Sequence, residues 1–146
     1  SGVEELVQLA PEIRENIWVG SNFYYTADTP VAREFVKSYQ AKFGGPPGYA
    51  PAAAYGMTRM MLHAMDKAKS TEVPDVIKAC EGLEVEDLVG KMRVDPKTHQ
   101  TLRPYFFMRC KKKDAMKHPM DFADIIATGS TPLPAEYAAC KDIGSL

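Results

Sequence analysis

The sequence contains no run of 18 apolar residues, and its first residues, SGVEELVQLAP, lack the basic start and the apolar stretch of a signal peptide. We therefore predict no membrane-spanning helix. An excess of charge of one sign is also absent, since 18 basic and 19 acidic side chains leave a formal net charge of -1. Nucleic-acid binding draws on clustered Lys and Arg. The charge balance therefore predicts no nucleic-acid partner, and the basic run at residues 111–113 is typical of a solvated loop.

The motifs of the common enzyme classes are missing. No GxSxG elbow, GxxxxGK[ST] loop or GxGxxG turn occurs, and the three histidines show no HExxH pairing. Cys80 lies near the end of a predicted helix, where the helix dipole raises the pKa of a thiol and so disfavours a nucleophile. We predict a protein that is not an enzyme and that needs no cofactor or metal. A small α/β enzyme using Cys80 or His99 is the less favoured alternative.

Cysteine is scarce. Cys80, Cys110 and Cys140 lie too far apart in the sequence for a metal-binding or CxxC redox motif. The count alone permits one disulfide with one free thiol, or three free thiols. It does not decide the cellular compartment.

What is present is typical of a globular domain. The chain has 146 residues, of which 45% are hydrophobic and 25% charged. A domain of this size buries roughly 70% of the surface that its unfolded chain exposes. The composition therefore predicts a substantial apolar core.

A first amphipathic helix is predicted from Thr29, a favourable N-cap, followed by Pro30. Gly44 and Gly45 end it. Its apolar residues recur at four-residue spacing, with one further residue beside them: Val31, Phe35, Tyr39 and Phe43, with Val36.

Two more helices follow. The second covers about residues 52–69, and the third begins after Ser70 or Thr71 and ends near Gly82. We expect one face of the second helix to be well buried: Ala53, Met57, Met60, Met61, Ala64 and Ala68. Thioethers are ligands for Cu(I), but the helical spacing of these methionines favours a role in the core.

Only about four strands are predicted around these helices. A short helix at residues 3–10, ended by Pro11, precedes the strand IWVG, and a short strand surrounds Ile125 and Ile126. KMRVD and TLRPYFFMRC form a predicted hairpin, and a half-turn of helix precedes Cys140. Pro104 cannot donate to a ladder, which favours an edge strand or a segment that crosses between lobes. Four short strands are too few to cover three helices.

The run FVKSYQAKFGGPPGYAPAAAYGMTRMMLHAMDKAKST, followed by HQTLRPYFFMRC, resembles the C-terminal part of the type I periplasmic binding proteins that serve ABC transporters of the branched-chain amino-acid type. The match covers about residues 17–110. Most relatives are expected to carry Asp where Gly56 follows Tyr55, so this chain departs from the pattern there.

The resemblance implies an α/β chain that is a fragment of a two-lobed fold, in which three crossing strands join the lobes and a small ligand lies between them. The implied divisions are the end of a second-lobe segment, a crossing strand with a cleft loop, the helical part of the first lobe, and a crossing strand with the C-terminal tail: 1–16, 17–25, 26–101 and 102–146. The missing strands would come from an N-terminal portion absent here.

The implied function is capture of a small metabolite, such as an amino acid, an amide or an aromatic carboxylate, in the periplasm or elsewhere outside the cytoplasm. The implied partners are this small-molecule solute, the membrane permease of an ABC transporter and the missing N-terminal portion. A ligand-sensing domain of a regulator or receptor is the alternative. Because the isolated fragment would expose an apolar patch, we also expect it to self-associate.

The loop GSNFYYTADTP follows a strand, and ligand pockets in open α/β sheets lie outside the carboxyl ends of strands. We predict that Phe23, Tyr24 and Tyr25 contact the ligand, because such rings offer large apolar faces and Tyr adds a hydroxyl. Asn22, with Ser21, is a candidate for polar contacts. In the alternative, two of the rings only cover the following helix.

Tyr49, in the loop PPGYAP, faces the same cleft by resemblance; packing over Pro46 and Pro47 is its alternative role. The resemblance also implies an oxidising compartment. In such a compartment Cys110 and Cys140 form the expected disulfide, which the chain-entropy model values at roughly 3–4 kcal/mol. Cys80 then stays free, and three reduced thiols are the alternative.

Overall fold

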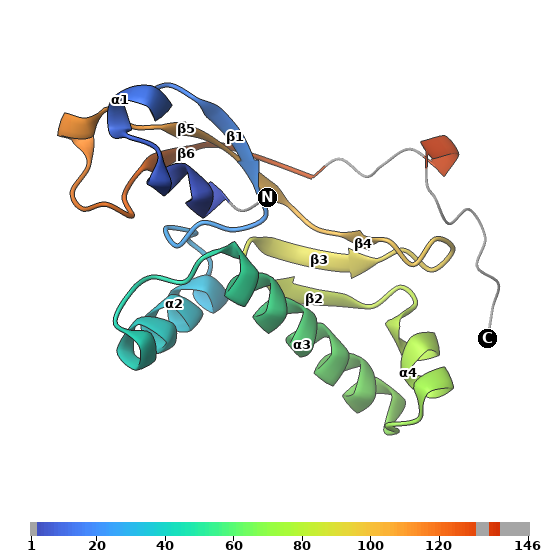
Figure 1. The fold of residues 1–146 in the computed structure, drawn as a ribbon. Coiled ribbons are helices and arrows are strands. Elements are labelled where there is room, and N and C mark those ends of the chain that lie inside the picture. The colour runs from blue at the N-terminus through green and yellow to red at the C-terminus, as the bar shows by residue number, and fades with distance from the viewer. Residues whose placement is uncertain (1–2, 131–134, 138–146) are drawn as a thin grey trace.

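The computed structural model describes residues 3–130 and 135–137 (Figure 1). Its helical elements, in chain order, are the 3-10 helix η1 (Val3–Gln8), α1 (Pro11–Arg14), α2 (Pro30–Phe43), α3 (Tyr49–Ala68), α4 (Val73–Cys80), and the 3-10 helices η2 (Lys113–Ala115) and η3 (Ala135–Tyr137). Its strands are β1 (Trp18–Ser21), β2 (Glu84–Asp87), β3 (Gly90–Val94), β4 (Thr101–Leu102), β5 (Tyr105–Cys110) and β6 (Ala123–Gly129).

These strands form two antiparallel sheets of three strands each, with the orders β1-β5-β6 and β2-β3-β4. Figure 1 shows the β2-β3-β4 sheet above α3, and the β1-β5-β6 sheet beyond it, next to α1. The chain passes from one sheet to the other between β4 and β5, at Pro104. The hairpin predicted for KMRVD and TLRPYFFMRC is confirmed for β3 and β4, but the second segment is not one strand, because it breaks at Arg103 and Pro104 into β4 and β5. Strand β4 lies at the edge of its sheet and β5 in the middle of the other, and a crossing between lobes at Pro104 stays a prediction.

The three helices in succession are confirmed. Thr29 Oγ1 accepts a hydrogen bond of 3.0 Å from the Ala32 amide at the start of α2, and Gly44, with φ of 78°, ends the helix. A positive φ of this kind favours glycine because it has no Cβ. The start of α3, at Tyr49, lies three residues before the expected one, because Pro51 is tolerated within the first turn of a helix.

The expected burial of the methionine face of α3 is only partly right. Its buried residues recur every fourth position, at Ala52, Gly56, Met60 and Ala64. Met57 and Met61 are each 40% exposed, contrary to the prediction. The buried stripe packs against β2 and α4, whereas Met57 and Met61 keep exposed surface on another side of α3.

Strand β2 was missed, because its sequence EVED contains three acids. The turn between β2 and β3 consists of Leu88 and Val89, and both side chains are buried. Thr29 Oγ1, besides capping α2, donates a hydrogen bond of 3.0 Å to the Leu88 carbonyl. The tip of this hairpin is therefore inserted into the core and fastened to the start of α2.

The shorter elements differ in detail from the prediction. The helix expected at residues 3–10 is the 3-10 helix η1, and Pro11 begins α1 rather than only ending the preceding helix. Proline at the first helical position costs no hydrogen bond. The short strand expected around Ile125 is the longer β6.

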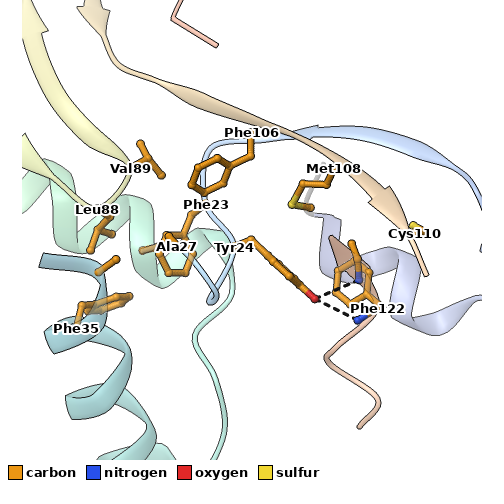
Figure 2. Packing of buried hydrophobic residues seen from close by; sticks show 13 residues of the cluster. Phe23, Tyr24, Ala27, Phe35, Leu88, Val89, Phe106, Met108, Cys110 and Phe122 are labelled. Atoms are coloured by element: carbon orange, nitrogen blue, oxygen red, sulfur yellow. Dashed lines mark hydrogen bonds between the residues drawn. The ribbon is translucent and has the colours of Figure 1, made fainter. Parts of the chain in front are cut away.

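The main core cluster joins the β1-β5-β6 sheet, the turn between β2 and β3, and the helices α2 and α3. Figure 2 shows Phe23 beside Phe35 and Phe106, and Tyr24 beside Phe122. These residues come from the loop after β1, from α2, from β5 and from the segment before β6. The segment between β1 and α2 thus lies at the centre of the structure.

Candidate functional site

The loop between β1 and α2, residues 22–29, carries most of the predicted site residues, and we call it the aromatic loop. Ser21, at the end of β1, holds its first turn. Its Oγ donates a hydrogen bond of 2.7 Å to the Phe23 carbonyl and accepts one of 3.3 Å from the Phe23 amide. The Ser21 hydroxyl, a candidate for polar contact with a ligand, therefore bonds to the backbone of the loop.

Two of the three aromatic residues are core residues. Phe23 is 0% exposed, and its ring meets that of Phe35 edge-on at a centroid distance of 5.9 Å. Tyr24 is 3% exposed and packs edge-on against Phe122 at 5.3 Å. Phe23 thus covers the following helix, as in the alternative interpretation, whereas Tyr24 packs against the segment before β6. The contact of either ring with a ligand stays a prediction.

The Tyr24 hydroxyl forms three hydrogen bonds with the backbone of the segment before and at the start of β6. It donates a hydrogen bond of 2.7 Å to the Met120 carbonyl. It also accepts bonds from the amides of Phe122, at 3.1 Å, and Ala123, at 3.3 Å, which Figure 2 shows as dashed lines. Burial raises the pKa of Tyr24 well above its ordinary value, although the two amide bonds oppose the shift. The hydroxyl thus fastens the aromatic loop to the start of β6.

Tyr25 is the aromatic residue of the loop that keeps exposed surface. Its hydroxyl lies 3.3 Å from Nε2 of His118, and burial raises the pKa of its hydroxyl. Beside it is an open groove of about 340 Å³ between the loop and α2. The groove is lined by Tyr25, Thr26, Ala27, Asp28, Arg33, Val36, Lys37 and Gln40.

The other two predicted residues lie at the margins of the loop and of α3. Asn22 has an exposed side chain, and its backbone carbonyl accepts a hydrogen bond of 3.3 Å from Nη2 of Arg103. Tyr49 is the first residue of α3 and is half-buried, after the buried Pro47. Their contact with a ligand stays a prediction.

The segment that holds His118 is itself ordered by a buried acid. Burial alone would raise the pKa of Asp121, but hydrogen bonds from Nζ of Lys111 at 2.6 Å and from the amide of Lys117 at 3.0 Å hold that pKa below its usual value. Lys111 also lies 3.2 Å from Asp124. The bond from the Lys117 amide thus holds the backbone next to His118, whose side chain is exposed beside Tyr25.

Sequence reasoning missed this histidine and one buried ion pair, Asp87 with Arg103. No motif marks either, since Asp87 stands in an acidic strand and Arg103 in a linking segment. The departure at Gly56 was the one available signal, because that glycine faces Asp87. The contact itself depends on how α3, β2 and the link after β4 fold together.

Within residues 3–130 and 135–137, no group of three or more His, Cys, Asp or Glu side chains lies close enough together to hold a metal ion. None of the helices in the same part of the chain is both long and apolar enough to cross a bilayer. Cys80 and Cys110, the two cysteines in the described part of the chain, are not joined to each other; Cys110 is buried, and burial raises the pKa of its thiol. Cys140 lies outside the described residues, so the predicted disulfide stays a prediction.

The sequence matches a known family over most of its length. The model of a family described as periplasmic binding protein matches residues 2–115. None of the curated proteins matches the sequence.

Solved structures are similar to this fold. An amino-acid ABC transporter substrate-binding protein from Pseudomonas fluorescens Pf-5 has a TM-score of 0.87 and 27% identity, over 95% of this chain and 37% of that one. A solute-binding protein of an ABC transporter from Rhodopseudomonas palustris BisB5, in complex with 3,4-dihydroxybenzoic acid, has a TM-score of 0.74 and 19% identity, over 90% and 36%. A leucine-, isoleucine-, valine-, threonine- and alanine-binding protein from Brucella ovis, in its closed conformation, has a TM-score of 0.69 and 21% identity, over 81% and 32%. The chain thus spans about a third of their length.

Proposed function

Because the chain belongs to the periplasmic binding protein family, we propose that it is the C-terminal part of a protein that captures a small solute between two lobes outside the cytoplasm and delivers it to the permease of an ABC transporter. The observation that carries this proposal is the family match over residues 2–115. The family consists of solute-binding proteins, which bind and release their ligand without making or breaking a bond. The proposed mechanism is accordingly lobe closure around the solute.

In this proposal β1 and β5 are strands that cross between the lobes, and α2, α3 and α4 belong to the first lobe. The antiparallel pairing of β1 with β5 places Trp18 opposite Arg109 and Ser21 opposite Phe106. It gives a continuous two-stranded ribbon suited to a hinge. The exposed side of α3, with Met57 and Met61, would be covered by earlier sequence of the same protein. The 37% coverage of the Pseudomonas fluorescens protein leaves ample chain for that role.

For the solute we propose contacts with Asn22 and Tyr25 of the aromatic loop and with Tyr49. Tyr25 and Tyr49 are half-buried, so each offers an aromatic ring with part of its surface exposed. The burial of Phe23 and Tyr24 favours a supporting role for these two, which keeps the backbone of the loop in place.

The solute proposed is an amino acid or an aromatic carboxylate. Rings with a hydroxyl suit a ligand that has an apolar body and one or two polar groups. Both ligand types fit this chemistry, and the similar structures include an amino-acid ABC transporter substrate-binding protein and a solute-binding protein in complex with 3,4-dihydroxybenzoic acid. The amide considered from the sequence is retained as a third ligand type for testing.

Calorimetry tests this proposal. The intact protein and the 146-residue chain are titrated with a panel of amino acids, their amides and 3,4-dihydroxybenzoate. We expect the intact protein to bind at least one of them, and the 146-residue chain to bind the same compound at least about 100-fold more weakly, because one wall of the cleft is missing. Equal affinity of the two would contradict the two-lobe proposal.

The exposed apolar side of α3 leads to a second expectation, that the 146-residue chain self-associates. Replacing Met57 and Met61 with glutamate should shift the chain towards the monomer in light scattering, because charges then occupy the apolar contact. Thr58→Glu, on an exposed neighbouring position, is the matched control and should change the mass little. A compact monomer before any substitution would refute the expectation.

A further inference from the structure

Asp87 is a buried acid for which the proposed solute contacts give no role. It is the last residue of β2 and is 2% exposed. Its Oδ2 lies 3.0 Å from Nη2 of Arg103, whose side chain is also largely buried. Neither Asp87 Oδ2 nor Arg103 Nε has a hydrogen-bond partner within the described chain, so the two charges compensate each other mainly by proximity. Buried charges that lose their partner are strongly unfavourable.

The space for this carboxylate comes from a residue without a side chain. A Cβ built on Gly56 would lie 2.6 Å from Asp87 Oδ1, much closer than atoms that are not bonded can approach. Gly56 stands in the buried stripe of α3, between Ala52 and Met60. The Asp87 carboxylate therefore fills the volume that a side chain at position 56 would occupy.

Arg103 connects this pair to the candidate site. Its Nη2 donates a hydrogen bond of 3.3 Å to the backbone carbonyl of Asn22, the first residue of the aromatic loop. One guanidinium thus holds together the end of β2, the link between β4 and β5, and the loop. Because the guanidinium is charged and largely buried, it keeps this position only while a carboxylate lies beside it.

We propose that Asp87 and Arg103 are positioning residues that fix the start of the aromatic loop, and that Gly56 provides the space in which their charges meet. The proposal rests on the proposed function in one respect, namely that this loop contacts the solute. It implies that the carboxylate needed by Arg103 can come from either of two elements. If Asp87 lost its carboxylate and an aspartate stood at position 56 of α3, the new carboxylate would occupy nearly the same place beside Arg103.

A set of variants of the 146-residue chain tests this by amide hydrogen exchange in the aromatic loop. Asp87→Ala leaves Arg103 without its acid, and we expect the exchange of loop amides to rise at least about tenfold, because the loop opens locally. Amides of α4, which pack in a separate cluster, should change much less. Gly56→Asp alone should also raise loop exchange, since two carboxylates then compete for one space.

The double variant Gly56→Asp/Asp87→Ala decides the question. It restores a carboxylate beside Arg103, and loop exchange should return to within about threefold of the unmodified chain. In Gly56→Asn/Asp87→Ala the side chain at position 56 has the same shape as aspartate but no charge, and loop exchange should stay high. If both double variants behave alike, or if Asp87→Ala raises exchange equally in α4, the proposal is wrong. Should Asp87→Ala fail to fold, the two double variants still give this comparison.

This exchange experiment uses no solute, so its result stands apart from the proposed function. In the intact protein, Asp87→Ala should lower the affinity for the compound that calorimetry identifies, and Gly56→Asp/Asp87→Ala should recover most of that affinity. If exchange follows the charge but no compound in the panel binds, the positioning role holds and solute capture fails. If a compound binds with equal affinity to all these variants, solute capture holds and the link from the pair to the solute is wrong.

Discussion

Replacing Phe23 with alanine is expected to lower the free energy of unfolding by about 3–5 kcal/mol, the range for a fully buried Phe. Phe23 is 0% exposed and lies where the aromatic loop, α2 and β5 meet. The lost ring would leave a cavity between elements that are distant in the sequence, and none of them can close it alone. Urea unfolding followed by circular dichroism measures the change.

The matched control for this loss is Phe107→Ala. Phe107 lies on β5 next to the buried Phe106, but it points to the other face of the strand and is 45% exposed. Its loss should cost about 1 kcal/mol or less. Equal losses for the two phenylalanines would show that the loop does not form the centre of the core.

Replacing Tyr24 with phenylalanine is expected to lower the free energy of unfolding by about 2–4 kcal/mol, although it removes a single oxygen. That oxygen serves the Phe122 amide, the Ala123 amide and the Met120 carbonyl. Phenylalanine keeps the ring but leaves buried backbone groups without a partner, which costs more than the loss of an exposed hydrogen bond. The same unfolding measurement applies.

Tyr25→Phe is the control at the neighbouring position. Its hydroxyl meets the exposed His118, where water replaces a lost contact. A change within about 0.5 kcal/mol is expected. If Tyr24→Phe is as mild as Tyr25→Phe, the hydroxyl of Tyr24 does not fasten the loop to β6, and a direct contact with solute becomes the better interpretation for it.

Local signals in the sequence predicted the helices well. Thr29, Pro30 and Gly44 each act within one turn of the chain, so the bounds of α2 follow from their chemistry. Strand β2 and the buried turn at Leu88 and Val89 depend on distant partners instead. An acidic stretch such as EVED becomes a strand because β3 pairs with it, which no local pattern records.

The candidate site shows the same division. The position of the aromatic loop after a strand was predictable from the order of β1 and α2. Which of its rings face inward was not, because that depends on Phe35 and Phe122, which lie in other elements. The ion pair of Asp87 and Arg103 could not be predicted either, because it forms only when α3, β2 and the segment after β4 fold together, with the Asp87 carboxylate against Gly56.

The buried hairpin tip at Leu88 and Val89 determines where a tag or a reporter domain can be inserted into this chain. A turn between two strands is ordinarily a good place for a peptide tag or a reporter domain. Here an insertion would pull apolar side chains out of the interior and break the bond from Thr29 to the Leu88 carbonyl. The opposite end of the same sheet is the suitable place. Its turn carries Pro96 and Lys97 in solvent, and Asp95 stabilises it by accepting hydrogen bonds from two amides of the turn itself.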